Sequence, residues 1–262
     1  MTVLLTGANG TVGTAITDHL DREFTTLDVA GGADYEENVA EYDAIRPAFE
    51  GRDAVIHLAG YPATDATWEQ ALTNNVVGTQ NVLRAASDAG VERVVFASSN
   101  HVVGMYEEEH APNLYKPDYP LVVDHTDPIR PDSHYGASKA CGEAFGRQYA
   151  ENEGVGFFTL RIGSVRDPEY DHPYGDAERG VEAGRWERDS EEYERQVARM
   201  KGTWLSRRDC AQLVECCLDA DREFEILYGV SDNDRRWFDI ERARESVGYE
   251  PRDNGEEWDE PS

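Results

Sequence analysis

The sequence predicts an α/β protein with a doubly wound parallel sheet and a small C-terminal region. Short apolar runs alternate with longer amphipathic stretches along most of the chain, a pattern typical of repeated strand–helix units. The runs themselves are almost wholly apolar, as strands must be when helices cover both faces of their sheet. A chain of 262 residues is long enough to bury such a sheet in one or two domains.

The expected elements follow one another in a regular order. The apolar runs place strands at residues 3–6, 24–29, 53–58, 93–98, 157–162 and 225–228. The amphipathic stretches between them place helices at about 12–20, 75–88, 135–152, 190–200, 209–219 and 239–247. The tail from Pro251 is acidic, and we expect it to fray.

The charge balance restricts the partners of the chain. Its 53 carboxylates and 25 basic residues leave a net charge of −28, which would repel nucleic acids and anionic membranes. Only three basic residues are lysines, and an acidic, lysine-poor surface suits a halophilic protein that works in high salt. A hydrophobic content of 39% with 10% aromatic residues indicates a packed core rather than disorder.

The four cysteines show neither CxxC nor Cys/His spacing, so free, buried thiols are expected and no metal site is predicted. The first expected strand starts at Val3, which leaves no room for a signal peptide. No apolar run approaches the length of a membrane span. These features predict a cytoplasmic protein.

Three glycines separate the first expected strand from the first expected helix. Gly7, Gly10 and Gly13 allow a tight turn that brings backbone N–H groups close to a pyrophosphate at the helix N-terminus, as in a Rossmann-type sheet. Asp28 ends the second strand, where a carboxylate accepts the ribose hydroxyls of an adenosine and repels a 2′-phosphate. No Arg or Lys lies between residues 22 and 46, so NAD is favoured over NADP. The alternative for Asp28 is an ordinary turn residue.

Tyr135 and Lys139 are four residues apart, which places them on one face of a helix. A phenol is a poor base at its free pKa near 10, and an adjacent ammonium stabilises the phenolate so that it accepts a proton from an alcohol. Ser99 follows a strand and is placed to hold the alcohol beside Tyr135. The alternatives are a surface pair for the two helical residues and a capping role for the serine.

These motifs together resemble the extended short-chain dehydrogenase/reductase family, also called the NAD-dependent epimerase/dehydratase family. The resemblance rests on the glycines, Asp28, the stretch 57–60, Asn75, Ser99 and the Tyr135–Lys139 pair. Within that family, the stretches 98–101, 161–164, 203–206 and 229–234 resemble those of uronate dehydrogenases. They resemble even more those of the NAD-dependent glucose-6-phosphate dehydrogenases of salt-loving archaea, which oxidise C1 of a cyclic sugar to a lactone.

The resemblance implies a role for each matching residue. Tyr135 is implied as the base, Lys139 as its partner and a ligand of the nicotinamide ribose, and Ser99 as the residue that orients the hydroxyl. By the same resemblance, Asn75 would support a water in the proton relay, and Ile162 and Ser164 would lie near the nicotinamide. The implied cofactor contacts are Gly7, Asn9, Gly10, Thr11, Val12, Gly13, Asp28, Asn38, Val39, Leu58, Ala59, Gly60, Asn75, Tyr135, Lys139 and Ile162. The implied substrate contacts are Ser99, Asn100, His101, Ser164 and Arg199.

Some positions depart from the family pattern. Pro62 stands where uronate dehydrogenases have a serine that touches the substrate, which counts against a uronate. Asn38 stands where an adenine-binding aspartate is common, although an amide makes a similar hydrogen bond. The stretch 61–69 holds no basic residue, so a substrate phosphate would need an arginine from 166–208. Arg199 suits a carboxylate or a phosphate equally, and as one of many arginines in a charged segment it is as readily a surface residue.

We expect residues 1–164 to form an NAD-binding domain and residues 165–262 to supply the substrate-binding region and to complete the sheet. Within the second region, residues 166–202 are charged and poor in aliphatic side chains. This insert is either a solvated acidic excursion or a lid over the substrate, since it follows a strand end where ligands bind in such folds.

The expected function is NAD-dependent oxidation of the anomeric C1 hydroxyl of a sugar, sugar phosphate or uronic acid to the lactone. One alternative is a nucleotide-sugar epimerase or dehydratase, but little chain remains after residue 164 to bind the nucleotide. The other is a non-catalytic NAD-sensing regulator, for which a catalytic tyrosine would be superfluous. The resemblance also implies a homodimer, formed by small and apolar residues of two helices: Val76, Leu83, Ala137, Cys141, Ala144 and Phe145.

Overall fold

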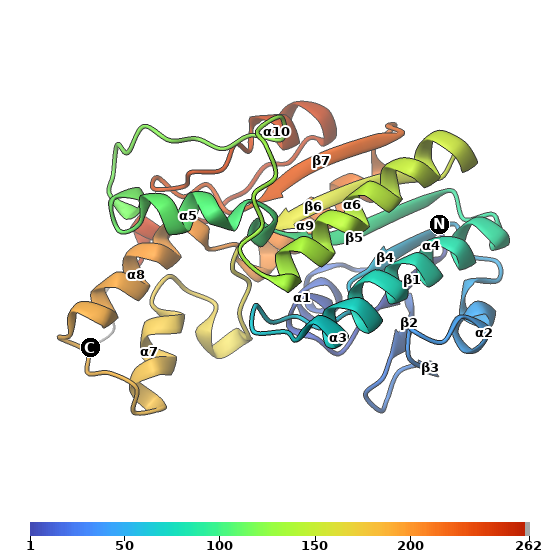
Figure 1. The fold of residues 1–262 in the computed structure, drawn as a ribbon, viewed down its shortest axis with the longest axis horizontal. Coiled ribbons are helices and arrows are strands. Elements are labelled where there is room, and N and C mark those ends of the chain that lie inside the picture. The colour runs from blue at the N-terminus through green and yellow to red at the C-terminus, as the bar shows by residue number, and fades with distance from the viewer. Residues whose placement is uncertain (260–262) are drawn as a thin grey trace.

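The computed structural model describes residues 1–259 and contains one sheet of seven parallel strands (Figure 1). The strands stand in the order β3-β2-β1-β4-β5-β6-β7. Their bounds are β1 Val3–Thr6, β2 Phe24–Asp28, β3 Tyr35–Glu36, β4 Ala54–His57, β5 Arg93–Ser99, β6 Gly156–Ile162 and β7 Phe224–Gly229. This order confirms the predicted doubly wound sheet of the Rossmann type.

The strand order reverses at β1, which pairs with β2 on one side and with β4 on the other. At the carboxyl end of β1, Thr6 lies opposite Leu27 of β2 and His57 of β4. The chain runs outward from β1 through β3, then returns to begin the second half of the sheet at β4. In doubly wound sheets the crevice at such a reversal is the place where ligands bind.

Helices cover both faces of the sheet, with α1, α9 and α10 on one and α2, α4 and α6 on the other. The bounds of the helices are α1 Thr11–His19, α2 Tyr42–Ile45, α3 Trp68–Gln70, α4 Gly78–Ala89, α5 Gly104–His110, α6 His134–Glu153, α7 Gly175–Glu182, α8 Glu191–Thr203, α9 Arg207–Asp219 and α10 Glu241–Val247. In Figure 1, α5, α7 and α8 lie beyond the carboxyl ends of the strands.

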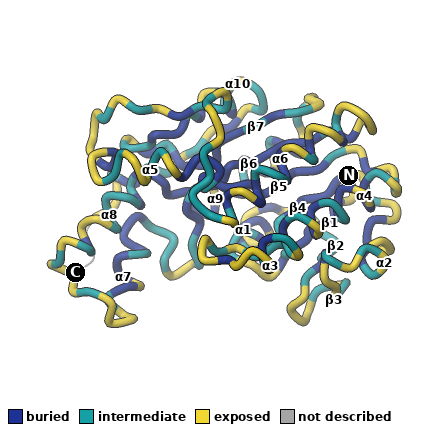
Figure 2. Tube along the Cα trace, in the orientation of Figure 1, coloured by how far each residue is buried: buried dark blue, intermediate teal, exposed yellow. Residues whose placement is uncertain are grey.

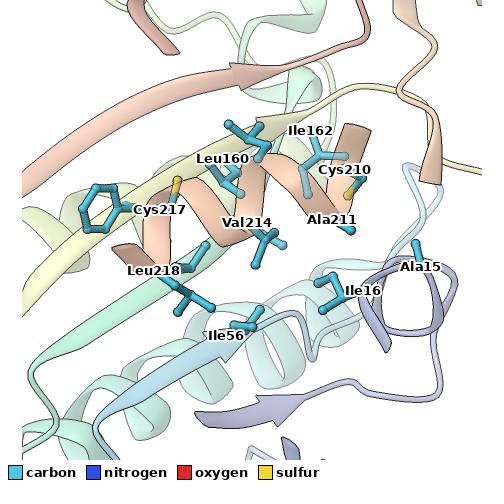
Figure 3. Packing of buried hydrophobic residues seen from close by; sticks show 14 of the residues in the cluster. Ala15, Ile16, Ile56, Leu160, Ile162, Cys210, Ala211, Val214, Cys217 and Leu218 are labelled. Carbon is cyan, nitrogen blue, oxygen red and sulfur yellow. The ribbon is translucent and has the colours of Figure 1, made fainter. Parts of the chain in front are cut away.

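Two hydrophobic clusters result from the alternation of side chains along each strand. On β1, Leu5 faces the α1/α9 side and Leu4 the α4/α6 side, and both are fully buried. Figure 3 shows the first cluster, in which Val214 and Leu218 of α9 and Ile16 of α1 gather around Ile56 of β4. Figure 2 shows that the sheet is buried along most of its length while its outer loops are exposed. The strands are apolar because neither of their faces meets water.

Each expected strand is present with bounds within two residues of the prediction, and each expected helix is present. The expected helix at 75–88 is divided, because a π-helical segment, η2 Ala71–Val77, precedes α4. The sequence analysis did not predict β3, α2, α3, α5 or α7. Each has eight residues or fewer and carries too few apolar side chains to show a clear period.

Residues 166–202 are folded rather than a plain excursion. The segment contains the expected helix as α8, and α7 packs against it through a small cluster of Tyr174, Ala177 and Tyr193. The expectation of a frayed tail was wrong over residues 251–259. The Asp209 carboxylate accepts backbone hydrogen bonds from Arg252 (2.9 Å) and Asp253 (3.0 Å), and Gly255 is buried. Residues 260–262 of the predicted tail lie outside the described residues.

One residue of the predicted dimer contact on α4 and α6 is not available for it. Leu83 was expected there, but it is fully buried in the chain's own core and is not available to a second copy. Ala137 and Ala144 are exposed on α6, and the dimer itself stays a prediction. All four cysteines are free, as predicted, but only Cys210 and Cys217 are buried, whereas Cys141 and Cys216 are half-buried. Within residues 1–259, no helix has both the length and the apolar composition that crossing a bilayer requires.

Candidate active site

A cavity of about 800 Å³ opens at the carboxyl ends of the strands, where the strand order reverses. Most of the residues that the sequence predicted as site residues line it. These are Gly7, Asn9, Gly10, Thr11, Val12, Gly13, Asp28, Asn38, Val39, Leu58, Ala59, Gly60, Ser99, Tyr135, Lys139 and Ile162. The cavity therefore joins the glycine-rich turn, the end of β2 and the start of α6 in one continuous space.

The glycine-rich turn leaves no room for side chains. Gly7 has a φ of +73°, and a Cβ there would lie 2.7 Å from the backbone nitrogen of Ala59, in the loop that follows β4. A Cβ on Gly13 would lie 2.4 Å from the carbonyl oxygen of Ala8. Gly10 begins α1 without a side-chain cap, so the first N–H groups of this helix remain available to an anion in the cavity.

Asp28 stands at the end of β2 and is held by two backbone groups. One of its carboxylate oxygens accepts a hydrogen bond from the N–H of Asn9 (2.9 Å), and the other accepts one from Ala30 (3.0 Å). A carboxylate offers about four acceptor positions, so two remain for the hydroxyls of a ribose. The bond to Asn9 also ties the carboxylate to the glycine-rich turn.

Tyr135 and Lys139 lie on the first turns of α6, and Ser99 lies at the end of β5. The Lys139 ammonium is 5.7 Å from the centre of the Tyr135 ring. Burial lowers the pKa of Lys139 to about 8, so the ammonium is still mostly protonated at neutral pH. Burial raises the pKa of Tyr135 above its ordinary value, whereas the Ser99 hydroxyl acts in the opposite direction. The phenol therefore needs a nearby positive charge before it becomes a base.

Asn75 lies behind the cavity wall rather than in it. It belongs to the π-helical segment η2, a kind of distortion that is frequent at functional sites. Its amide oxygen accepts a hydrogen bond from the N–H of Tyr61 (2.7 Å), and its amide nitrogen donates to the Ser138 hydroxyl (2.9 Å). A Cβ on Gly60 would lie 2.8 Å from the Asn75 oxygen and 3.8 Å from the Lys139 nitrogen, so glycine keeps this corner open.

Asn100 and His101 begin the short helix η3 Asn100–Val103 directly after Ser99, and neither lines the cavity. The Nδ1 atom of His101 lies 2.5 Å from a carboxylate oxygen of Asp132. The ring of His101 stands edge to face with that of Tyr135, with their centres 6.0 Å apart. Sequence analysis did not single out Asp132, which fixes the orientation of His101 next to Tyr135.

Ser164 and Arg199 also lie outside the cavity lining. The Ser164 hydroxyl is buried and hydrogen-bonded to that of Thr203 (3.0 Å). The Arg199 guanidinium is bound in a two-pronged ion pair by Glu107 of α5, at 2.6 and 3.1 Å. Tyr115 donates a further hydrogen bond to the same carboxylate (2.8 Å). Glu107 thus already binds the Arg199 guanidinium, which the resemblance assigns to the substrate.

Other residues that line the cavity were not predicted. They are Leu27, Val29, Ala30, Glu37, Tyr61, Pro62, Asn74, Ala97, Ser98, Gly163, Val165, Arg166, Asp167, Asp176 and Arg179. The last six come from the segment after β6, whose position behind a strand end was the available signal. Asp167 accepts a hydrogen bond from the Thr11 hydroxyl (2.7 Å), so this segment lies directly against the glycine-rich turn. Among the residues described, His, Cys, Asp and Glu side chains form no group of three that could hold a metal.

Comparison with known proteins identifies the family. A model of the NAD dependent epimerase/dehydratase family matches residues 3–220. The NAD-dependent glucose-6-phosphate dehydrogenase of Haloferax volcanii is 41% identical over 98% of this chain and 95% of its own. The L-arabinose 1-dehydrogenase (NAD(P)(+)) of the same organism is 36% identical over 96% of both chains. A structure of uronate dehydrogenase from Agrobacterium tumefaciens complexed with NAD matches with a TM-score of 0.74 and 28% identity, over 97% of this chain and 86% of that one. The chain belongs to the NAD-dependent epimerase/dehydratase family, the extended short-chain dehydrogenases/reductases.

Proposed function

We propose that this protein is an NAD-dependent sugar dehydrogenase that oxidises the anomeric C1 hydroxyl of a sugar, a sugar phosphate or a uronic acid to the lactone. One observation carries the proposal. A single cavity has Asp28 and the glycine-rich turn at one end and Ser99, Tyr135 and Lys139 at the other. A dinucleotide held at the first end would reach the second, where Tyr135 would act as the base and Lys139 as its cationic partner.

The relatives support the same reaction class. Two that cover nearly the whole chain are named as sugar dehydrogenases, one NAD-dependent and acting on glucose 6-phosphate, the other acting on L-arabinose with NAD or NADP. Both names describe dehydrogenases, and neither describes an epimerase or a regulator. The cavity supports this class, because it brings the glycine-rich turn and Asp28 into one space with Tyr135, the proposed proton acceptor.

The chain's residues divide the proton chemistry among them. Ser99 hydrogen-bonds the C1 hydroxyl and holds it beside Tyr135, whose phenolate accepts the hydroxyl proton. Lys139 supplies the positive charge that stabilises the phenolate, since its pKa of about 8 keeps it mostly protonated at neutral pH. NAD, when bound, supplies the oxidised nicotinamide that accepts the C1 hydrogen together with its electron pair. Asp28 binds the adenosine ribose and disfavours NADP by repelling its 2′-phosphate.

The neighbourhood of Arg199 bears on which sugar is used. A uronate would have to displace Glu107 to reach this guanidinium, and the displaced carboxylate would lose both of its hydrogen bonds to Arg199. Pro62, which lines the cavity, offers no hydroxyl to a substrate. These features favour an aldose or a sugar phosphate over a uronate. Asn100, His101 and Ser164, each within two residues of a residue that lines the cavity, are proposed to contact the sugar when it is bound.

The wider organisation is part of the proposal. Residues 1–164 bind the cofactor, residues 165–262 form the substrate-binding region, and 166–202 act as a lid at the cavity mouth. The protein works as a homodimer in a salt-rich cytoplasm. The alternatives remain a nucleotide-sugar epimerase or dehydratase and a non-catalytic NAD-sensing regulator.

A substrate panel tests the proposal. The purified protein is mixed with NAD and, in turn, with arabinose, glucose, glucose 6-phosphate, glucuronate and a UDP-sugar in molar salt. NADH is read by absorbance, and the sugar products are identified by chromatography. At least one sugar is expected to reduce NAD, with the lactone as product. Conversion of a UDP-sugar without net NADH would establish the epimerase alternative. Tight NAD binding with no turnover of any compound would establish the sensor.

A further inference from the structure

Three basic side chains line the cavity, and their surroundings differ. Lys139 is 5% exposed and lies at the catalytic end. Arg166 donates to both carboxylate oxygens of Asp176, each at 2.6 Å. Its charge and two of its N–H donors are therefore already paired. Arg179 is exposed, and within residues 1–259 no carboxylate lies at ion-pair distance from it. Of the three, Arg179 alone presents an uncommitted guanidinium to the cavity.

The position of Arg179 follows from the fold of its segment. The chain leaves β6 and passes along the glycine-rich turn, where Thr11 donates to Asp167 and Arg207 donates to the carbonyl oxygen of Thr11 (3.2 Å). It then forms α7, which presents Asp176 and Arg179 to the same cavity. The ion pair between Arg166 and Asp176 fixes the first turn of α7 and so fixes where Arg179 stands.

The charge of the chain makes this guanidinium significant. Asp28, Glu37, Asp167 and Asp176 all line the cavity, and the whole chain carries −28. A phosphoryl group that enters such a cavity is repelled unless a cation compensates for it, and a planar guanidinium binds phosphate oxygens through two parallel hydrogen bonds.

We propose that Arg179 of α7 is a phosphate-binding residue of this cavity. Two sources of the phosphoryl group fit the same chemistry, the pyrophosphate of the dinucleotide and the phosphate of a phosphorylated sugar. This inference rests on the proposed function, because it takes the cavity to hold a dinucleotide and a sugar. It adds a role for α7 that goes beyond a covering lid.

The test measures binding by titration calorimetry, so that it does not depend on turnover. NAD is titrated into the free protein, and glucose 6-phosphate into protein saturated with NADH, for the parent, Arg179→Gln and Arg185→Gln. Arg185 is the matched control, because it is an exposed arginine of the same segment that does not line the cavity. Thermal melting and circular dichroism confirm that each variant is folded.

Loss of one charge-assisted contact predicts that Arg179→Gln weakens one of the two ligands by about tenfold or more. Arg185→Gln is expected to change neither ligand by more than about twofold, which separates a direct contact from a general change in charge. Weaker NAD binding assigns Arg179 to the pyrophosphate, and weaker glucose 6-phosphate binding alone assigns it to the sugar phosphate. If the parent binds NAD and Arg179→Gln alters neither affinity, or alters them no more than Arg185→Gln does, the inference is overturned. A parent that fails to bind NAD refutes the proposed function instead.

Discussion

Arg161 of β6 and Glu143 of α6 form a buried, two-pronged ion pair, with nitrogen–oxygen distances of 3.0 and 2.9 Å. Glu143 also accepts a hydrogen bond from Ser98 of β5 (2.6 Å), and Arg161 donates one to the Tyr228 hydroxyl (2.9 Å). Glu143 follows Lys139 by one helical turn. The network therefore holds α6, the helix that carries Tyr135 and Lys139, against the centre of the sheet.

Glu143→Ala is expected to destabilise the protein by about 3–5 kcal/mol, because it leaves the Arg161 guanidinium buried and uncompensated. Urea unfolding in molar salt measures the change. Glu151→Ala, at an exposed position of the same helix, is the control and should cost less than about 0.5 kcal/mol. The double variant Glu143→Leu, Arg161→Met should recover most of the loss, since it removes both charges. A loss of unfolding free energy below about 1 kcal/mol for Glu143→Ala would show that this ion pair does not stabilise the fold.

Cofactor preference is expected to depend on the charge of Asp28. Asp28→Asn keeps an acceptor for the Asn9 N–H but no longer repels a 2′-phosphate, so the ratio of kcat/KM with NAD to that with NADP should fall by about tenfold. Asp28→Ala should narrow the ratio as well. Asp43→Ala removes an exposed carboxylate outside the cavity and should leave the ratio unchanged. Equal efficiency of the parent with both cofactors would contradict this role.

The protein is expected to lose stability as the pH falls, because of His57. Burial, and then the charge of Lys139, lower the pKa of His57 to about 3 from an ordinary value of 6.5. Below pH 6.5 the unfolded chain binds a proton that the folded chain excludes, so this contribution to stability is complete above 6.5 and is lost as the pH falls. The loss is about 1.4 kcal/mol per pH unit, or about 2 kcal/mol between pH 6.5 and 5.

His57→Gln should remove that part of the pH dependence, whatever it costs at neutral pH. Unfolding free energies at pH 6.5 and 5 for the parent, His57→Gln and the exposed control His19→Gln give the comparison. The parent and the control should lose about 2 kcal/mol more than His57→Gln over this interval. Equal losses in all three would show that His57 does not govern the acid response.

Buried strands and the glycine-rich turn were predictable because their signals are local. β1, β4, β5 and β6 are covered on both faces, so their sequences are continuous apolar runs that end in polar or small residues. The glycines of the turn lie within seven consecutive residues, Gly7–Gly13. Tyr135 and Lys139 lie within one helix, α6. A short stretch of sequence therefore contains the whole pattern.

Contacts between distant segments could not be predicted in this way. Glu107 meets Arg199 across 92 residues, and nothing near either residue identifies the other as its partner. The apolar side of α7 is limited to Ala177 and Val181, which is too short a pattern to identify a helix from sequence. Tyr193 of α8 and Trp186 pack against this side and stabilise the helix. The tail was expected to fray because its composition is acidic, yet Asp209 binds its backbone from another helix.

The acidic surface predicts a dependence on salt. As salt falls below about 0.1 M, the Debye length exceeds about 10 Å and the repulsion among 53 carboxylates is no longer screened. The folded segment 166–202, with few aliphatic anchors, is expected to loosen first, so activity should fall before the far-ultraviolet circular dichroism changes. Saturating NAD should delay the loss, because it binds only the native state. Undiminished activity in dilute buffer would contradict the halophilic interpretation.

The central claim is that Tyr135 accepts the proton of a sugar hydroxyl in a cavity that also binds NAD. Tyr135→Phe tests it most directly, because the ring keeps its packing while the proton acceptor is lost. The measurement pairs kcat/KM on the best sugar of the panel with NAD affinity by calorimetry, for the parent and the variant in molar salt. The account predicts that turnover falls by about 10²–10⁴-fold or more while NAD affinity stays within about twofold. Turnover within a few-fold of the parent would remove Tyr135 from this role and would contradict the account.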